Sequence, residues 1–284
     1  MRATVSLTRL VATWHAPTSR LPVELHLTPC IVTNPPGVGA WCDALVNPAN
    51  ERLAGTRFTP GECAQFLAPG NILYPPQVID GLVHGARGDS SGGDARGGAA
   101  LVQAIAALPV LEGTDVRCPT GSAVSTAAFG ELRECFAHVI HTCAPFYGNA
   151  AWHALLHSSY ESALTAAEDV GATSCALPLL GAGAVRTRLP ADGTPRRRQR
   201  PSLRGNVCAA IPPRRRLCWL DSRHRQRGAP VGEASDVAAA ALAHWRGRGM
   251  LRSVRFAVQE ESVAQVLATA LDVALEPQAS DSST

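Results

Sequence analysis

Several residue types are scarce or missing in this 284-residue chain. Lysine is absent, so Arg carries the whole fixed positive charge, and charged residues make up only 17% of the chain. No apolar run reaches the roughly 18 residues that a membrane-spanning helix needs. The nine cysteines are odd in number and none of them forms a CxxC pair. That pattern is typical of reduced, buried thiols and disfavours a disulfide framework, or a zinc site built from Cys135, His138, His141 or Cys143.

Apolar residues, at 46%, are abundant enough for a sizeable core, and the length allows one large or two small domains. The formal net charge of +3 hides an uneven distribution. Half of the arginines lie between Arg186 and Arg227, and the rest of the chain has an excess of acidic residues. On charge alone the chain is therefore not a general nucleic-acid binder.

Short apolar or β-branched runs alternate with amphipathic stretches. The runs predict strands buried on both faces at Val23–Leu27, Ala44–Val46, Ala123–Thr126, His138–His141, Cys175–Leu180 and Val254–Val258. Apolar steps of three and four residues predict helices at Ala95–Leu108, Trp152–Val170, Val231–Trp245 and Glu261–Leu271. This alternation favours a layered α/β fold.

Three stretches depart from that rhythm. Residues 1–20 contain Arg, Ser and Thr without an acidic residue, as a targeting segment would, but Ala3–Thr13 is also β-branched enough for a first strand. Arg57–Gln77 is predicted to be a long loop. Arg186–Arg227 has no apolar period and is predicted to be a disordered basic insertion, or translated sequence outside the mature protein.

Two polar motifs lie at the ends of predicted elements, one after a strand and one at the possible start of a helix. The strand ending in Val46 runs into Asn47 and Asn50, whose amides suit ribose hydroxyls but would equally satisfy a turn. If a helix opens near Asp80, then His84 lies four residues on and on the same face. Such a pair can orient or activate a water, although an acidic residue in a first helical turn and a half-buried His are also ordinary features.

A third motif follows the strand that begins at Cys175. Its small residues let backbone N–H groups approach a diphosphate, with a helix N-terminus adding positive potential. The motif consists of Gly181, Ala182, Gly183 and Ala184. A tight turn, or a fragment of a dinucleotide-binding fold, would use the same residues.

Taken in order, these motifs resemble the macrodomain family. Cys118–Ala123 is similar to its CPTGEA segment and Val139–Tyr147 to its VIHTVGP strand. The resemblance runs from about Val23 to Leu271 outside the basic insertion and is nearest a plant and algal type. It implies a three-layer α/β/α fold with a mixed central sheet. The macrodomain would occupy residues 21–184 and 227–273, with the insertion at 185–226 and a tail at 274–284.

By resemblance, the ligand is ADP-ribose or an ADP-ribosylated protein. Asp80 would position or deprotonate a water, Asn50 and His84 would fix the distal ribose, and Asn47 would brace the turn. The backbone of Gly181–Ala184 would hold the diphosphate, and Phe146 would wall the ribose pocket. The scheme needs no metal or other cofactor and no membrane, and it places the protein in the cytoplasm or nucleus, or in an organelle if residues 1–20 are a targeting segment.

Three positions depart from the family pattern. Cys30 stands nearest the place of an adenine-binding Asp, Val258–Gln259 replaces a stacking aromatic, and Tyr74–Gln77 replaces a run of glycines. These departures predict that adenine is bound weakly or by other groups.

The sequence is compatible with more than one function. A hydrolase of mono-ADP-ribosyl-protein, O-acetyl-ADP-ribose or ADP-ribose phosphate is the main hypothesis, and a non-catalytic reader is the alternative. An RNA-binding arm would place steeply salt-dependent affinity in Arg186–Arg227. A nicotinamide-dependent oxidoreductase would need an acidic ribose ligand about 20 residues past Gly183, where the chain has Arg200 and Arg204.

Overall fold

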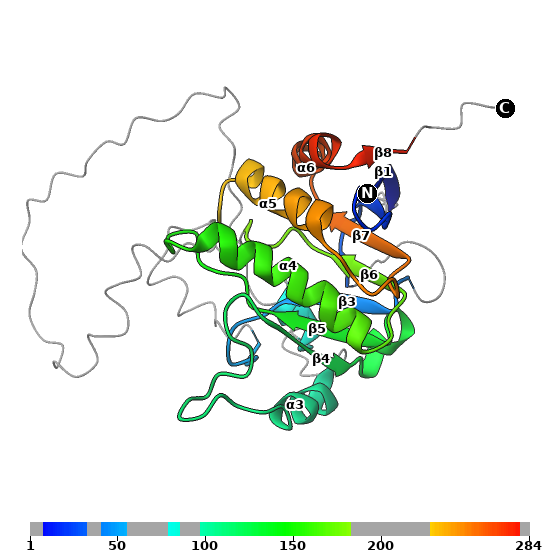
Figure 1. The fold of residues 1–284 in the computed structure, drawn as a ribbon. Coiled ribbons are helices and arrows are strands. Elements are labelled where there is room, and N and C mark those ends of the chain that lie inside the picture. Colours follow the sequence, from blue (N-terminus) through cyan, green and yellow to red (C-terminus); the bar gives the residue numbers. More distant parts are fainter. Residues whose placement is uncertain (1–7, 33–40, 56–78, 86–96, 183–227, 279–284) are drawn as a thin grey trace, which may run out of the picture.

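The computed structural model describes residues 8–32, 41–55, 79–85, 97–182 and 228–278 (Figure 1). These residues form one eight-stranded sheet in the order β4-β5-β3-β6-β7-β2-β1-β8. The strands are β1 (Arg9–His15), β2 (Pro22–Leu27), β3 (Ala44–Pro48), β4 (Ala123–Ala127), β5 (His138–Thr142), β6 (Ser174–Leu177), β7 (Ser253–Val258) and β8 (Glu276–Pro277).

The sheet is mixed. The inner strands β5, β3, β6, β7 and β2 run parallel, whereas β4, β1 and β8 are antiparallel to their neighbours. Successive strand residues point to opposite faces of the sheet, so each inner strand contributes side chains to a core on each face. The mixed sheet expected from the sequence is therefore confirmed.

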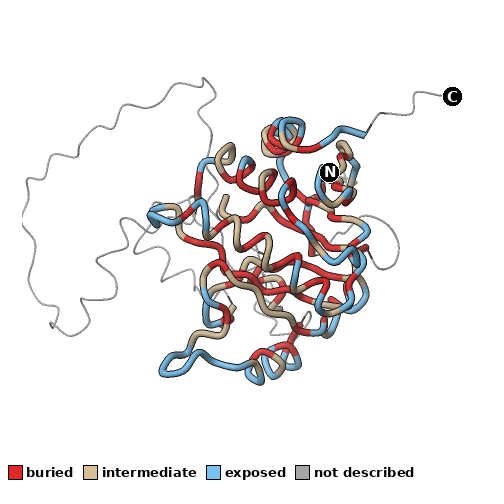
Figure 2. Tube along the Cα trace, in the orientation of Figure 1, coloured by how far each residue is buried: buried red, intermediate tan, exposed pale blue. Residues whose placement is uncertain are grey.

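Helices cover both faces of the sheet. On one side α4 (Trp152–Asp169), α5 (Val231–His244) and α6 (Glu261–Ala274) pack with Val46, Leu177 and Phe256 in one apolar core. On the other side α2 (Ile79–Val83) and α3 (Gly98–Ala106) pack with Leu45 and Val139 in a second core. Figure 1 views the sheet from the α4–α5 side, and Figure 2 shows burial concentrated in the strands and the inner helix faces. The molecule is thus a three-layer α/β/α sandwich, as expected.

Several element boundaries differ from the sequence expectation. β6 ends at Leu177 instead of continuing to Leu180, because Pro178 lacks an N–H for the ladder and the Leu180 N–H donates to the Tyr160 hydroxyl at 2.8 Å. Among the described residues, α3 begins at Gly98, and it ends before Leu108, which precedes a proline. Within the described residues the first strand covers Arg9–His15, and the part of the expected strand at Ala3–Leu7 lies outside them. A 3₁₀ turn at Gly130–Glu134 and the short β8 were not expected.

The carboxyl ends of the parallel strands meet at one edge of the sheet. Leu45 of β3 pairs with Ala176 of β6, and Asn47 pairs with His141 of β5. The turns that follow these strands therefore emerge side by side. In open α/β sheets this edge is where ligands bind.

The two sides of the basic stretch lie next to each other in space. The Ala229 N–H donates to the Gly181 carbonyl at 2.9 Å, and α5 begins two residues later, at Val231. The predicted insertion at Val185–Gln226 lies outside the described residues. The hydrogen bond nevertheless shows that the chain can pass from Gly181 to Ala229 without displacing either element.

This proximity predicts that the basic stretch is dispensable for folding. Removing Val185–Gln226 shortens a loop whose ends already meet, and loop-closure entropy changes by only about 0.6 kcal/mol for each twofold change in length. We expect the free energy of unfolding of the deletion variant to match or exceed that of the full chain in urea denaturation. A loss above about 2 kcal/mol would show that the stretch packs on the fold.

A buried carboxylate fixes the loop between α5 and β7. The side chain of Glu168 is only 1% exposed, and its oxygens accept the backbone N–H groups of Arg248, Met250 and Leu251. Burial raises the pKa of Glu168, but these hydrogen bonds and the Arg248 charge outweigh it, so the pKa lies below the usual 4.5. Neighbouring Asp169 also contacts Arg248, but its side chain is 58% exposed.

We expect Glu168→Gln to lower the free energy of unfolding by about 2–3 kcal/mol, because the amide would turn an N–H₂ group toward a backbone donor. The matched control, Asp169→Asn, should cost less than about 1 kcal/mol, as exposed ion pairs do. Since folding lowers the Glu168 pKa, its contribution is complete above pH 4.5 and is lost as the pH falls through the folded value. Urea titrations at neutral and acidic pH measure both effects, and equal losses in the two variants would contradict the assignment.

Candidate active site

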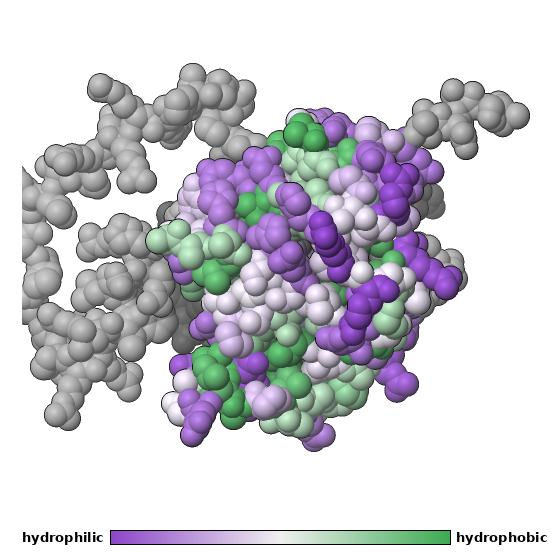
Figure 3. All heavy atoms as spheres, viewed as in Figure 1, coloured by the Kyte–Doolittle hydropathy of each residue, from purple (hydrophilic) through white to green (hydrophobic). Residues whose placement is uncertain are grey.

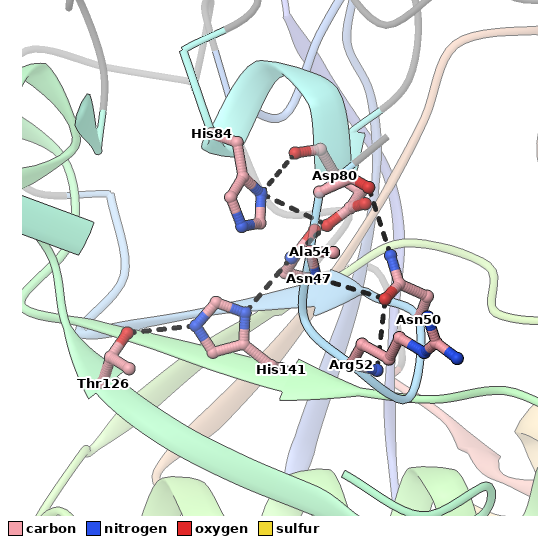
Figure 4. Close-up of polar contacts among 9 residues, drawn as sticks. Asn47, Asn50, Arg52, Ala54, Asp80, His84, Thr126 and His141 are labelled. Carbon is pink, nitrogen blue, oxygen red and sulfur yellow. Dashed lines mark hydrogen bonds and ion pairs between the residues drawn. The ribbon is translucent and has the colours of Figure 1, made fainter. Parts of the chain in front are cut away.

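The candidate site is built on the edge where β3 and β5 end. β3 alternates its side chains so that Val46 enters the α4–α5 core while Asn47 faces α2. Asn47 is fully buried, and its Nδ2 donates to the Asp80 carboxylate at 3.0 Å and approaches Nδ1 of His141 at 3.3 Å (Figure 4). Asn47 therefore joins the strand to the short helix that carries Asp80.

Asp80 and His84 form a close pair, as their spacing predicted. His84 follows α2 directly, and its Nδ1 lies 2.8 Å from the Asp80 carbonyl oxygen and 3.4 Å from the Asp80 carboxylate. Both neighbours are acceptors, so Nδ1 carries the proton. The side chains are 7% exposed for Asp80 and 13% for His84.

The charge on Asp80 changes how His84 titrates. Burial alone lowers the pKa of His84, but the hydrogen bond and charge of Asp80 outweigh burial and raise it above the usual 6.5. A protonated His84 is therefore favoured by the fold. Its stabilising contribution is complete below pH 6.5 and is lost as the pH rises through the folded value.

Asn50 closes the turn after β3. Its Nδ2 donates to the Gly55 carbonyl at 3.2 Å, and its Oδ1 accepts the N–H groups of Arg52 and Ala54. The bracing role expected of Asn47 thus belongs to Asn50, while Asn47 reaches Asp80. Gly55, at a φ of +71°, lets the turn pass over His84, whose ring carbon a β-carbon there would meet at 3.0 Å.

The small-residue turn lies at the end of β6. Gly181 has a φ of +79°, and a β-carbon on it would meet Leu156 of α4 at 2.9 Å, so the backbone comes close to that helix. Gly181 and Ala182 are half-buried at the same sheet edge as Asn50, whereas Gly183 and Ala184 lie outside the described residues. Phe146 is half-buried in the segment after β5, also at this edge. The contacts of these residues with a ligand stay a prediction.

Two partners at this edge were missed from the sequence. The spacing of His141 suggested only a weak zinc site, yet its ring lies between Asn47 and Thr126, with Nε2 3.0 Å from the Thr126 hydroxyl. The Tyr147 hydroxyl donates to Glu233 in the first turn of α5 at 2.8 Å, which ties the segment after β5 to the helix beyond Ala229. The polar residues Asn47 and His141, each near the end of a predicted strand, could have suggested the contact between them. Nothing in the sequence signals the contact between Tyr147 and Glu233.

Two features, a cluster of metal-ligand side chains and a membrane-spanning helix, are not found in the described part of the chain. No group of at least three His, Cys, Asp or Glu side chains there gathers as metal ligands would. No helix in the same residues is both long and apolar enough to cross a bilayer. The face seen in Figure 3 mixes small apolar patches with hydrophilic groups.

Two cavities within the described residues lie away from this site. One of about 370 Å³ is lined by Leu21, Trp245 and Leu251, and one of about 490 Å³ by Ala127, Phe129 and Phe136. Leu21 and Leu251 precede β2 and β7, and Ala137 precedes β5, so both cavities sit at the amino ends of the parallel strands. The buried Asp80–His84 pair and the strand topology, not cavity size, identify the candidate site, since loops bordering its edge are outside the described residues.

Comparison with known proteins identifies the fold. The family model Macro domain matches residues 94–191, and solved macrodomains superpose over most of the chain. The chain has the macrodomain fold. A macrodomain of Oceanobacillus iheyensis with ADP superposes with a TM-score of 0.55 at 15% identity, covering 94% of this chain and 97% of that one.

Further macrodomain structures agree. A variant of the Oceanobacillus iheyensis protein with ADPR gives a TM-score of 0.53 at 15% identity, covering 94% of this chain and 97% of that one. The Trypanosoma brucei macrodomain in complex with ADP gives 0.50 at 17% identity, covering 88% of this chain and 68% of that one. No curated protein matches the sequence. At this identity the likeness establishes the fold of the macrodomain, and its resemblance to a plant and algal type stays a prediction.

The Asp80–His84 pair generates a titration prediction. Asp80→Asn removes the charge that raises the His84 pKa but leaves the burial that lowers it, so we expect the pKa to fall below 6.5. NMR titration of the His84 ring measures the shift. Asp272→Asn is the control, because Asp272 accepts from Trp14 elsewhere and should leave His84 unchanged. A His84 pKa that does not respond to Asp80→Asn would contradict the pairing.

Proposed function

We propose that this macrodomain binds ADP-ribose and hydrolyses an ADP-ribosyl bond, with mono-ADP-ribosyl-protein, O-acetyl-ADP-ribose or ADP-ribose phosphate as the substrate class. The observation that carries the proposal is the buried Asp80–His84 pair, held by Asn47 at the carboxyl edge of the sheet. A carboxylate and an imidazole in hydrogen-bond contact at a ligand edge suit proton transfer from water. The solved macrodomains with ADP or ADPR support the choice of ligand.

The diphosphate would lie at the turn after β6. The backbone of Gly181 and Ala182, continued by Gly183 and Ala184, offers N–H groups without obstructing side chains, and the 14-residue helix α5 starts beside it. The Tyr147–Glu233 hydrogen bond ties the first turn of α5 to the segment that follows β5. Phe146 and the turn closed by Asn50 would flank the distal ribose.

In the proposed reaction, a water oxygen attacks the ribose carbon that bears the leaving group. The bond from that carbon to the leaving oxygen breaks and its electron pair stays on the leaving group. The water proton passes to the Asp80–His84 pair. Within the described residues Nε2 of His84 is buried and has no hydrogen-bond partner.

A reader without catalysis is the second candidate, favoured by the near-complete burial of Asp80. Asp80→Ala separates the two. For a hydrolase we expect turnover of a mono-ADP-ribosylated protein to fall at least about a hundredfold, as loss of a general base does, while the ADP-ribose Kd from calorimetry changes by less than about tenfold.

The matched control is Asp115→Asn, which removes an exposed carboxylate that pairs with Arg52. Its turnover and Kd should equal those of the wild type. If the wild-type protein binds ADP-ribose but releases nothing from any of the three substrate classes, the hydrolase proposal fails and the reader stands. If it binds no ADP-ribose, both fail.

A further inference from the structure

A line of buried polar side chains leads from Asp80 into the sheet (Figure 4). The Asp80 carboxylate accepts from Asn47 at 3.0 Å, Asn47 lies 3.3 Å from Nδ1 of His141, and Nε2 of His141 lies 3.0 Å from the Thr126 hydroxyl. Asn47 and His141 are fully buried, and Thr126 is 8% exposed. The line therefore begins at the candidate site and ends on β4, near the edge of the sheet.

Strand register brings these side chains onto one face. Asn47 of β3 pairs directly with His141 of β5, and Thr126 of β4 pairs with Val139, two residues before His141. Directly opposed and diagonal neighbours on one face lie within reach of each other. The contacts among Asn47, His141 and Thr126 thus follow from the pairing of rigid strands, not from a loop.

The donors and acceptors allow one arrangement. The side facing Asp80 must be the Asn47 N–H₂ group, because an amide oxygen would oppose the carboxylate. The second proton of that group points at Nδ1 of His141, which must accept it. His141 is then neutral and carries its proton on Nε2, where it donates to Thr126.

The surroundings of His141 keep it neutral. Burial, followed by the nearby charge of His84, lowers its pKa to about 3, although Asp80 acts in the opposite direction. Within the pH range in which a hydrolase works, the ring does not gain a second proton. It can therefore serve as a fixed acceptor.

We propose that His141 and Thr126 are positioning residues that hold the Asn47 amide in the only orientation that donates to Asp80. The proposal rests on the proposed hydrolase function. Neither residue reaches the substrate. Their contribution is to fix the direction and hydrogen bonding of the Asp80 carboxylate before a water is bound, as preorganised groups around a reacting centre do.

Loss of the Thr126 hydroxyl has a specific consequence for the protonation of His141. Without an acceptor at Thr126, the His141 proton has no reason to stay on Nε2 and can move to Nδ1. An N–H at Nδ1 would face the Asn47 N–H₂ group, so the amide would turn over and present its oxygen to Asp80. A purely structural network would cost stability when broken but would not couple the His141 proton to turnover.

The decisive test is a pair of substitutions at one position in the full chain. His141→Asn places an amide oxygen where Nδ1 lies and can still accept from Asn47. His141→Gln places its amide near Thr126 and leaves Asn47 without that acceptor. We expect His141→Gln to lower kcat on a mono-ADP-ribosylated protein by roughly ten- to a hundredfold, and His141→Asn by less than about threefold, from the usual strength of a hydrogen bond to a charged group. KM and the ADP-ribose Kd should change by less than about twofold in both.

A second pair uses Thr126. Thr126→Ser keeps the hydroxyl and should retain wild-type kcat, whereas the near-isosteric Thr126→Val removes it and should lower kcat about tenfold with unchanged KM. Long-range ¹H–¹⁵N spectra of the ring report the tautomer directly. In the wild type and Thr126→Ser the proton should sit on Nε2 at about pH 5 to 8, and in Thr126→Val a fraction should sit on Nδ1.

The outcomes are separable. Equal kcat losses in His141→Asn and His141→Gln, or a wild-type proton on Nδ1, overturn the positioning role, even if the variants are folded and active. A wild-type protein that binds no ADP-ribose overturns the proposed function instead, and the tautomer and the hydrogen-exchange protection of the Asn47 amide still decide whether the line is ordered as inferred. Should a His141 variant fail to fold, the Thr126 pair decides between a positioning and a purely structural role.

Discussion

The hydrogen bond from Asn47 to Asp80 is the contact on which the candidate site depends. It ties the central strand β3 to a helix of a single turn, α2, which is too short to hold its own geometry. Burial makes the contact strong and also makes each of its partners necessary, because a polar group without a partner is costly where water is excluded. The direction in which the Asp80 carboxylate is held against β3 follows from where this one amide points.

The sequence was sufficient to predict the parts of the fold that depend on local patterns. Apolar runs such as Val23–Leu27 and Val254–Val258, and the long amphipathic stretch from Trp152, were confirmed as strands and a helix with small errors at their ends. The spacing of Asp80 and His84 also predicted their contact, since both belong to one helical turn. The mixed sheet and the three-layer arrangement came from resemblance, because no local pattern encodes which strands become neighbours.

The roles of the site residues were harder to predict. Asn47 and Asn50 lie in one short motif, and only the strand's alternation and the path of the turn determine that Asn50 closes the turn while Asn47 reaches across to α2. The part played by His141 required the register of β5 against β3, and that of Thr126 required the register of β4 against β5. Pairings between residues far apart in sequence are set by sheet assembly, which a reading of one chain cannot supply.

The hydrogen bond between Ala229 and Gly181 has a consequence for protein engineering. Gly181 and Ala229 meet at the carboxyl edge of the sheet, so the loop between them is a suitable site for inserting a second domain. A folded insert whose own termini are close together can be joined there without distorting the rest of the fold. This insertion site lies beside the turn that is expected to bind a diphosphate. A ligand bound at that turn would therefore change the surroundings of the inserted domain. A fluorescent protein placed between Ala184 and Arg227, in place of Val185–Gln226, is therefore expected to report whether that turn is occupied.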